Sequence, residues 1–157
     1  MYQHILVPID GSDTAAQGLR EAIRLAADQK ARLRLLYVID DFPMLVELAS
    51  VESFDASLQK LRNHGEKLLA DAKTLAGQAG VESDPVLREV TQGRIAETVV
   101  DEATISRCDL VVMGTHGRRG LSRMALGSDA DLVVRTSPVP VLLVRQHPGI
   151  IEDARGG

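Results

Sequence analysis

Glycines, arginines and a serine gather in one stretch near the end of the chain, residues 113–145, which reads MGTHGRRGLSRMALGSDADLVVRTSPVPVLLVR. Glycine has no Cβ, so the backbone N–H groups around it can approach a phosphate closely. Guanidinium groups bind phosphate oxygens in pairs and neutralise their charge. No carboxylate lies between residues 114 and 127, a segment whose glycines and arginines include Gly114, Gly117, Arg118, Arg119, Arg123 and Gly127. These residue types predict a local site for an anion such as phosphate.

A short helical pattern near 128–135 begins directly after Gly127. The N-terminus of a helix presents unpaired backbone N–H groups and the positive end of the helix dipole, which together bind anions. Ser128 adds a hydroxyl donor at the same point. The chain contains neither G-x-x-x-x-G-K-[ST] nor G-x-G-x-x-G. It therefore does not match the P-loop NTPases or the dinucleotide-binding Rossmann proteins.

The composition limits the other functions that the chain can have. Its 157 residues suit one compact domain, which we expect to span residues 1–146, with a polar tail over 147–157. A net charge of −4 and an aromatic content of 3% argue against nucleic-acid binding, which needs a broad basic surface or exposed stacking rings. The anion site must therefore be local.

Neither a membrane segment nor a secretory signal is expected. No run approaches the roughly 20 apolar residues that span a bilayer. The N-terminal residues MYQHILVPIDGS lack a basic region followed by a long apolar core. Cys108 is the only cysteine, so no internal disulfide can form, and no Cys/His cluster has zinc-ligand spacing. We expect Cys108 to be a buried, inert thiol and the protein to be cytoplasmic.

Strand-like and helix-like patterns alternate along the chain. Apolar strand patterns cover five segments, 4–10, 32–40, 84–90, 108–114 and 137–145. Helical patterns lie between them, at 14–31, 54–75, 94–107 and 128–135. Parallel strands need crossover helices, and crossovers are right-handed. The order therefore predicts an α/β fold, an open doubly wound parallel sheet with helices on both faces.

Two helices carry local signals of where they begin and end. Ser12 or Asp13 is available to cap the first helix. In the longest helix an apolar stripe runs over 54–75, and Gly65 fills its one gap. The glycines that follow, at 77 and 80, are expected to end that helix.

Ligands of such sheets bind outside the carboxyl ends of the strands, where the strand order reverses. In this chain those ends are 8–12, 38–41, 91–93 and the residues from 114 onward. Asp10 leaves the first strand and the glycine stretch leaves the fourth, so both are candidates for one site.

The glycine spacing is G-x2-G-x9-G-[ST], realised as Gly114, Gly117, Gly127 and Ser128. Together with HILVPIDGS at the start, GTHGRRG in the middle and PVPVLLVR at the end, it resembles the universal stress protein family over nearly the whole chain. The resemblance implies a five-stranded, Rossmann-like fold of the adenine nucleotide alpha hydrolase-like type and a regulatory role in the stress response. It also implies ATP binding, in the branch that keeps this motif, and a homodimer. The dimer contact would run through the last strand, at Val139, Val141 and Leu143.

The resemblance also assigns roles to the matching positions. Asp10, with Pro8 beside it, would contact the ribose or the metal-phosphate region, so that magnesium would lie near Asp10. Val38 would contact adenine, and Met113 and Gly114 would line the base and ribose. Positions further along the glycine stretch would hold the phosphates. The full set of nucleotide-binding positions would be Pro8, Asp10, Val38, Met113, Gly114, Gly117, Arg118, Gly127, Ser128, Asp129 and Ala130.

Asp129 departs from the family pattern, in which a small apolar residue often follows Gly-Ser. Its carboxylate would repel a triphosphate unless a divalent cation lay between them. Alternatively, it points away and stabilises the helix N-terminus electrostatically, which is the interpretation that we favour.

Three functions remain open at this point. The first is a regulatory ATP-binding protein. The second is a slow ATPase or a self-phosphorylating enzyme, although the motif supplies no obvious general base or water-positioning group. The third, suggested by Asp129, is a dimeric interaction module with a vestigial nucleotide site.

Overall fold

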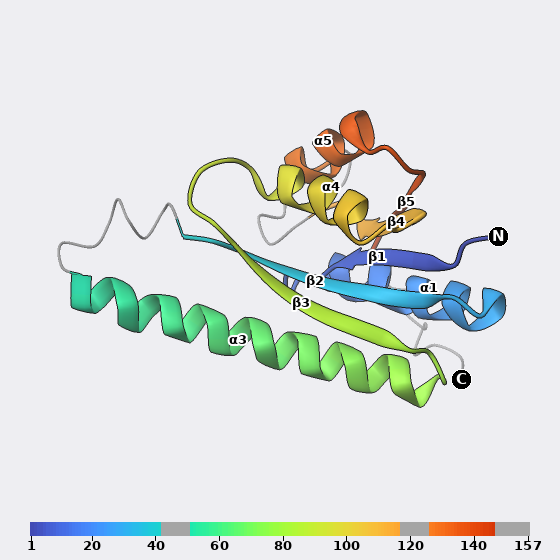
Figure 1. Cartoon of the computed structure of the whole chain (residues 1–157), viewed down its shortest axis with the longest axis horizontal. Helices are drawn as coiled ribbons and strands as arrows, with labels where there is room; N and C mark the ends of the chain where they lie inside the picture. Colours follow the sequence, from blue (N-terminus) through green and yellow to red (C-terminus); the bar gives the residue numbers. More distant parts are fainter. Residues whose placement is uncertain (42–50, 117–125, 147–157) are drawn as a thin grey trace, which may run out of the picture.

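The computed structural model describes residues 1–41, 51–116 and 126–146, and within them the chain forms one parallel sheet (Figure 1). The strands pair in the order β3-β2-β1-β4-β5, each parallel to its neighbours. Their bounds are β1 His4–Pro8, β2 Arg32–Asp40, β3 Ser83–Val90, β4 Leu110–Gly114 and β5 Val141–Val144.

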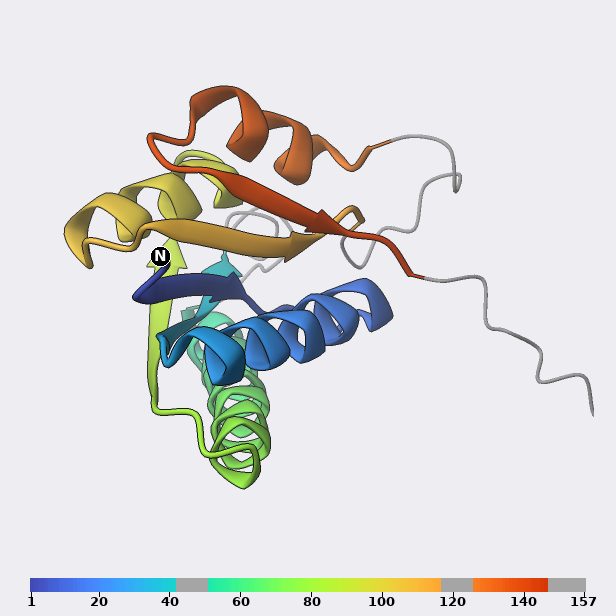
Figure 2. The ribbon, with the colours of Figure 1, turned by 90° about the vertical axis from the view of Figure 1, so that its right-hand side faces the viewer.

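Helices cover both faces of the sheet, as Figures 1 and 2 show. Helices α1 and α3 pack on one face, and α4 and α5 pack on the other. Their bounds are α1 Asp13–Gln29, α3 Val51–Gln78, α4 Ile95–Ile105 and α5 Ser128–Thr136. The predicted open, doubly wound α/β fold is therefore confirmed.

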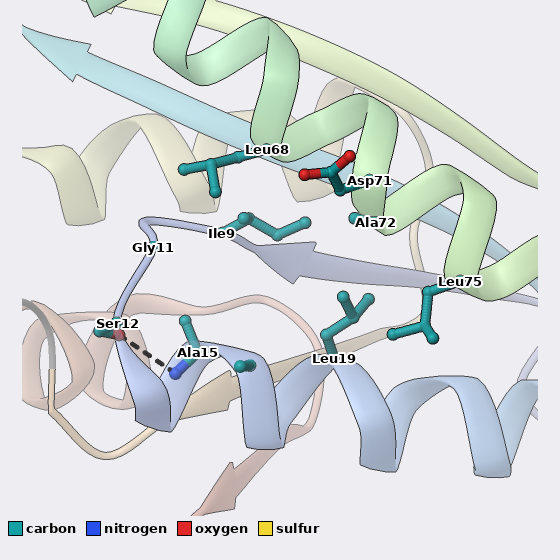
Figure 3. Close-up of a pocket in the computed structure, with 10 residues that line it drawn as sticks. Ile9, Gly11, Ser12, Ala15, Leu19, Leu68, Asp71, Ala72 and Leu75 are labelled. Atoms are coloured by element: carbon teal, nitrogen blue, oxygen red, sulfur yellow. Dashed lines mark hydrogen bonds between the residues drawn. The ribbon is translucent and has the colours of Figure 1, made fainter.

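Helix α1 begins where the sequence predicts, because Ser12 caps it. The Ser12 Oγ accepts a hydrogen bond from the Ala15 backbone N–H at 3.2 Å (Figure 3). The Ser12 carbonyl accepts from the N–H of Ala16 at 3.0 Å. The first bond pairs one of the N–H groups that a helix N-terminus otherwise leaves open, and the second is the first backbone bond of the helix itself.

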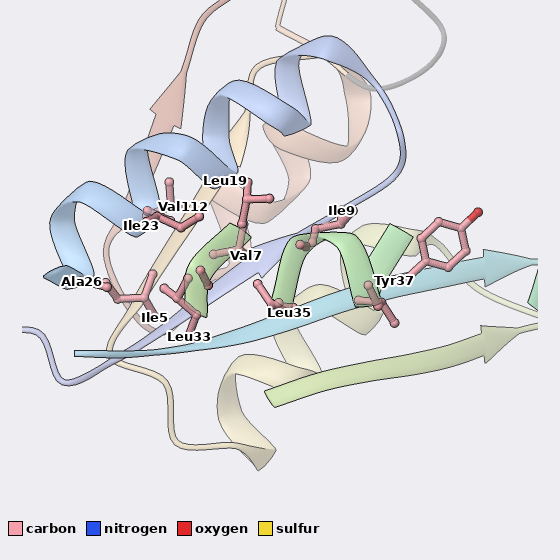
Figure 4. Packing of buried hydrophobic residues seen from close by; sticks show 14 of the residues in the cluster. Ile5, Val7, Ile9, Leu19, Ile23, Ala26, Leu33, Leu35, Tyr37 and Val112 are labelled. Carbon is pink, nitrogen blue, oxygen red and sulfur yellow. The ribbon is translucent and has the colours of Figure 1, made fainter. Parts of the chain in front are cut away.

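Strand alternation builds the larger core, between the sheet and helices α1 and α3. The side chains of Ile5, Val7 and Ile9 point into it from β1 and the residue that follows (Figure 4). Leu33 and Leu35 on β2 join them, because successive residues of a strand face opposite sides of the sheet. The residues between them, such as Leu6, face the smaller core beneath α4 and α5.

Gly65 fills a gap in the apolar stripe of α3 because a ring lies against it. A Cβ at Gly65 would come within 2.5 Å of Cδ1 of Tyr37, whose side chain is buried on β2. Helix α3 ends at Gln78, between Gly77 and Gly80, as predicted for this pair of glycines. Gly80 follows the helix with a φ of 74°.

Two strand boundaries also differ from the sequence prediction. The first strand ends at Pro8, and the Asp10 Oδ1 accepts a hydrogen bond from the Ser12 N–H at 2.8 Å, which makes Asp10 part of a turn. The last strand begins at Val141, since Pro140 has no N–H to donate to a sheet. Val139 therefore precedes β5, which corrects its placement on the last strand.

Candidate functional site

The sheet opens between β1 and β4 at its carboxyl end. These two strands pair only at Ile5↔Leu110 and Leu6↔Val111, although β1 continues to Pro8. Strand β4 pairs with β5 as far as Gly114↔Val144. The chain also reverses its direction of winding here, because it leaves β1 toward β2 and returns to the other side of β1 as β4. This is the position at which doubly wound sheets bind ligands.

The N-terminus of α5 lies at this end of the sheet. The backbone N–H of Gly127 donates to the carbonyl of Thr115, directly after β4, at 2.8 Å. Gly127 is the N-cap of α5, and no side chain caps the helix there. The Gly127 N–H is thus engaged within the protein, and a phosphate contact by Gly127 stays a prediction. The backbone N–H groups of Ser128, Asp129 and Ala130 follow in the first turn, where no intrahelical acceptor exists for them.

The N-terminus of α1 offers one open N–H group fewer to an anion, because the Ser12 Oγ accepts from the N–H of Ala15. The N–H of the N-cap residue is engaged in both helices, by Asp10 at Ser12 and by Thr115 at Gly127. Both helices also carry carboxylates in the first turn, Asp13 in α1 and Asp129 and Asp131 in α5. Of the helices that begin beside β1 and β4, α5 therefore has the more open N-terminus.

Gly114 is required for packing as well as being a predicted ligand contact. A Cβ there would lie 2.7 Å from the carbonyl carbon of Thr14 and 2.8 Å from its oxygen. A Cβ at Gly18, one turn further along α1, would lie 3.3 Å from the backbone nitrogen of Gly114. The end of β4 therefore lies directly against the first turns of α1.

Two buried threonines that the sequence analysis did not single out hold this junction. The Thr14 Oγ1 donates a hydrogen bond to the carbonyl of His116. The Thr115 Oγ1 lies 2.8 Å from the His116 Nδ1, and its backbone N–H donates to the carbonyl of Val144 at 3.0 Å. Their sequence signal is weak, since only the fold brings Thr14 of α1 beside the residues that follow β4.

Several predicted site residues share the α4/α5 face of the sheet. Met113 and Ala130 are buried in the core beneath these helices, and Val38 packs against the same cluster. Pro8 and Asp10 are half-buried at the end of β1 and in the turn after it. Gly117 and Arg118 lie outside the described residues, as do Arg119 and Arg123.

Asp129 occupies the first turn of α5 and is half-exposed. A carboxylate in the first helical turn interacts favourably with the positive end of the helix dipole. Asp131 lies in the same turn and forms an ion pair with Arg135 at 3.2 Å. This position is compatible with the favoured interpretation of Asp129, which stays a prediction.

A separate cavity of about 210 Å³ lies between α1 and α3, on the opposite face of the sheet (Figure 3). Its walls are mostly apolar, with Ile9, Leu19, Leu68 and Leu75 among them, and it contains no predicted nucleotide-binding residue. Ligand pockets usually measure about 300–1,000 Å³. This cavity is thus too small for a nucleotide and is not part of the candidate site.

Neither the Cys108 thiol nor a cluster of metal ligands among the described residues adds a reactive group to the site. Burial raises the pKa of the Cys108 thiol to about 12, and its side chain is 4% exposed, which confirms that it is buried and inert. Across the described ranges, no three His, Cys, Asp or Glu side chains gather closely enough to hold a metal ion. Magnesium at this site would need phosphate and water ligands in addition to any carboxylate, as is usual for Mg²⁺ with nucleotides.

Within the described residues no helix combines the length and apolarity needed to cross a membrane.

The strand order, the helices on both faces and the open helix N-terminus at the switch point define a doubly wound, Rossmann-like α/β protein. Residues 1–145 match the model of the universal stress protein family, and the chain belongs to that family.

The relatives agree with this assignment. The chain is 34% identical over 146 residues to Universal stress protein MJ0531 of Methanocaldococcus jannaschii, which covers 93% of this chain and 84% of that protein. The solved structure of hypothetical protein MJ0577 is similar with a TM-score of 0.83 at 28% identity, covering 94% of this chain and 99% of that one. A universal stress protein solved in complex with cAMP has a TM-score of 0.62 at 26% identity, covering 92% and 97%.

Proposed function

We propose that this protein binds ATP at the carboxyl ends of β1, β2 and β4 and acts as a regulatory protein in the stress response. The observation that carries the proposal is the open N-terminus of α5, with Ser128, Asp129 and Ala130 in its first turn beside the exit of β4. Backbone N–H groups in such a turn bind phosphate. The related universal stress protein solved with cAMP supports an adenine nucleotide as the ligand class.

In this proposal each end of the nucleotide has its own partners. Val38 and Met113, on one face of the sheet, contact the adenine, and Gly114 lies beside the ribose. The Ser12 N–H holds one carboxylate oxygen of Asp10, which fixes that side chain at the end of β1, where it contacts the ribose or magnesium. Pro8, Gly117, Arg118 and Gly127 complete the set, together with the phosphate-binding residues of α5. A cytoplasmic location belongs to the same proposal.

Titration calorimetry with Mg-ATP tests the proposal, with Asp129→Asn as the matched variant. We expect saturable binding by the wild type and a change of less than about threefold in Kd for Asp129→Asn, because a carboxylate that faces the helix dipole makes little contact with phosphate. Absence of binding at millimolar nucleotide would contradict ATP binding. A Kd for Asp129→Asn that is tenfold or more below that of the wild type would instead favour the dimeric interaction module with a vestigial nucleotide site.

We further propose that the protein is a homodimer and that nucleotide occupancy changes the stability of the dimer. Strand β5 is an edge of the sheet, and edge strands with apolar side chains pair readily with another chain. Val141 and Leu143 are half-buried against α5, and Leu142 on the opposite face is 39% exposed. Val134 of α5 adds a second exposed apolar side chain.

The variant Leu142→Asp is expected to convert the dimer to a monomer, since it places a charge in an apolar contact. Ile105→Asp is the control, because Ile105 is 70% exposed at the end of α4, away from β5. Sedimentation equilibrium measures the mass of the wild type and of each of the two variants. A wild type that sediments as one chain, or a Leu142→Asp variant that remains a dimer, would refute the β5 contact.

A further inference from the structure

A buried histidine, His4, lies at the amino end of the sheet. It begins β1 and is 8% exposed, whereas His64 is exposed on α3 and His116 is half-buried after β4. Residues two apart on a strand face the same side of a sheet, so the His4 ring lies on the same face as Leu6, which belongs to the core beneath α4 and α5. A titratable ring is thus enclosed at the end of β1 opposite to the proposed nucleotide site.

The two nitrogens of the His4 ring have different surroundings. The Nδ1 lies 2.9 Å from the backbone carbonyl oxygen of Ser106, which can only accept a hydrogen bond, so the Nδ1 carries a proton. The Nε2 is buried, and no group in the described part of the chain forms a hydrogen bond with it. The neutral ring fits this place, since its one N–H is paired. A protonated ring would put a second N–H and a positive charge where no acceptor lies, which is unfavourable.

The charged groups on the neighbouring strands also favour the neutral ring. Arg32 is the partner of His4 in the register of β1 and β2, and Arg34 follows two residues later, opposite Asp84 of β3. Burial, and after it the positive charge of Arg32, lower the pKa of His4 below its ordinary value of 6.5, and Arg34 adds to the effect. The hydrogen bond to Ser106 and the negative charge of Asp84 raise the pKa but are outweighed.

The carboxylates on the other elements packed against His4 are engaged elsewhere. Glu102 of α4 binds the arginines of β2 and β3 and the hydroxyl of Ser106. Asp109, which precedes β4, accepts from the backbone N–H groups of Gln3 at 2.8 Å and of His4 at 3.1 Å. Neither carboxylate serves the His4 Nε2 as an acceptor. The connection between α4 and β4 adds an exposed cation and a protonated thiol, Arg107 and Cys108.

The His4 ring closes the corner between α4 and β1. Ser106 is the C-cap of α4, and the end of a helix leaves its last carbonyls without intrahelical donors. The His4 Nδ1 supplies a donor to one of these carbonyls. The backbone carbonyl of His4 accepts from the N–H of Asp109 at 2.9 Å, so the same residue also holds the approach to β4. A ring that moves out to bring its Nε2 to water gives up the bond to Ser106 and loosens this corner.

We propose that His4 is a pH-sensitive contact, which holds the end of α4 on β1 as a neutral ring and leaves this place on protonation, so that mild acid loosens the corner and destabilises the fold. The unfolded chain, in which a histidine has a pKa of about 6.5, takes up the proton more readily than the folded protein. The stabilisation is therefore full above about pH 6.5 and is lost as the pH falls from there toward the folded-state pKa. The proposal does not depend on nucleotide binding.

The test compares the wild type with His4→Asn, whose side-chain amide replaces the Nδ1 donor but does not titrate. His64→Asn is the matched control, because His64 is exposed on α3. Urea denaturation between about pH 7.5 and pH 5 measures the folding equilibrium constant, in a range in which Glu102 stays ionised. NMR follows the ring resonances of His4 over the same range, and the exchange rate of the Asp109 amide, which donates to the His4 carbonyl, reports on the corner.

We expect the folding equilibrium constant of the wild type, relative to that of His4→Asn, to fall about threefold or more between about pH 7.5 and pH 5. His64→Asn is expected to keep the pH dependence of the wild type. Exchange of the Asp109 amide, corrected for the intrinsic rate, is expected to become faster at the acidic end in the wild type but not in His4→Asn. A His4 ring that titrates at or above about pH 6.5, or parallel pH profiles of wild type and His4→Asn, would overturn the proposal. If His4→Asn does not fold, the ring titration and the Asp109 exchange of the wild type decide.

Discussion

Replacing Glu102 by alanine is expected to destabilise the fold by about 2–4 kcal/mol. Glu102 lies on α4 with 2% exposure, among the apolar side chains of the smaller core. The Arg34 Nη2 lies 3.0 Å from its Oε1, the Arg88 Nε 2.9 Å from its Oε2, and the Ser106 hydroxyl donates to it at 2.8 Å. Removal of the carboxylate leaves two arginines without their acceptor. The Arg88 side chain is 44% exposed and can contact water, so the loss of stability is smaller than for a fully buried ion pair.

Urea denaturation at neutral pH measures this loss. Glu21→Ala is the control, because the Glu21–Arg24 pair at 3.2 Å is exposed and such pairs contribute less than about 1 kcal/mol. Glu102→Gln, which keeps the size of the side chain, is expected to lie between Glu102→Ala and the wild type. Equal stability of Glu102→Ala and Glu21→Ala would refute a stabilising role for the buried carboxylate.

The same carboxylate predicts a pH dependence. Burial would raise the pKa of Glu102, but hydrogen bonds from Arg88, Ser106 and Arg34 outweigh burial and lower the pKa. A group with a lowered folded-state pKa stabilises the protein above its unfolded pKa, about 4.3 for glutamate, and loses that effect as the pH falls through the folded value. The stability difference between wild type and Glu102→Gln is therefore expected to be full at neutral pH and to shrink below about pH 4.

Gly114→Ala is the second substitution with a large expected effect, a loss of about 3 kcal/mol. The new Cβ would lie 2.7 Å from the carbonyl carbon of Thr14 and 2.9 Å from its Cβ. The nearest of these atoms belong to helix backbone, so the contact cannot be relieved by rotating a side chain. Strand β4 and helix α1 must separate, and ATP affinity is expected to fall together with stability.

Gly77→Ala provides the matched control. Gly77 lies within α3, and a Cβ there would meet nothing within 4 Å. Alanine is a better helix former than glycine by about 0.5–1 kcal/mol, so this variant is expected to gain stability. Thermal unfolding of both variants measures the difference. A Gly114→Ala protein as stable as Gly77→Ala would contradict the close packing of β4 against α1.

Local patterns in the sequence predicted the fold well. The continuous apolar run of β4, the Ser12 cap and the alternation of strands with helices each depend on neighbouring residues, and the structure confirms them. The end of the first strand was placed two residues too late, because Asp10 follows the apolar run but forms a turn with Ser12. Val139 was placed on the last strand for its apolar character, although Pro140 delays the start of β5.

Features that depend on distant contacts were not predictable. Glu102 lies in an ordinary helical pattern, and it is buried only because Arg34 and Arg88 reach it from two different strands. Leu75 belongs to the apolar stripe of α3, yet it is 40% exposed beside the cavity between α1 and α3. Thr14 becomes important only when the fold brings His116 beside it. The predicted ligand residues remain a proposal, supported by their placement around β1, β2, β4 and α5.

Residue-resolved NMR of the backbone amides during titration with Mg-ATP tests the central claim most directly. The claim is that phosphate binds at the N-terminus of α5 and not at that of α1. It predicts saturable shifts, with one common Kd, for the amides of Ser128, Asp129 and Ala130, and small shifts for those of Ala15 and Ala16. Shifts confined to the first turn of α1 or to the cavity between α1 and α3, with the α5 amides unchanged at saturating nucleotide, would contradict it.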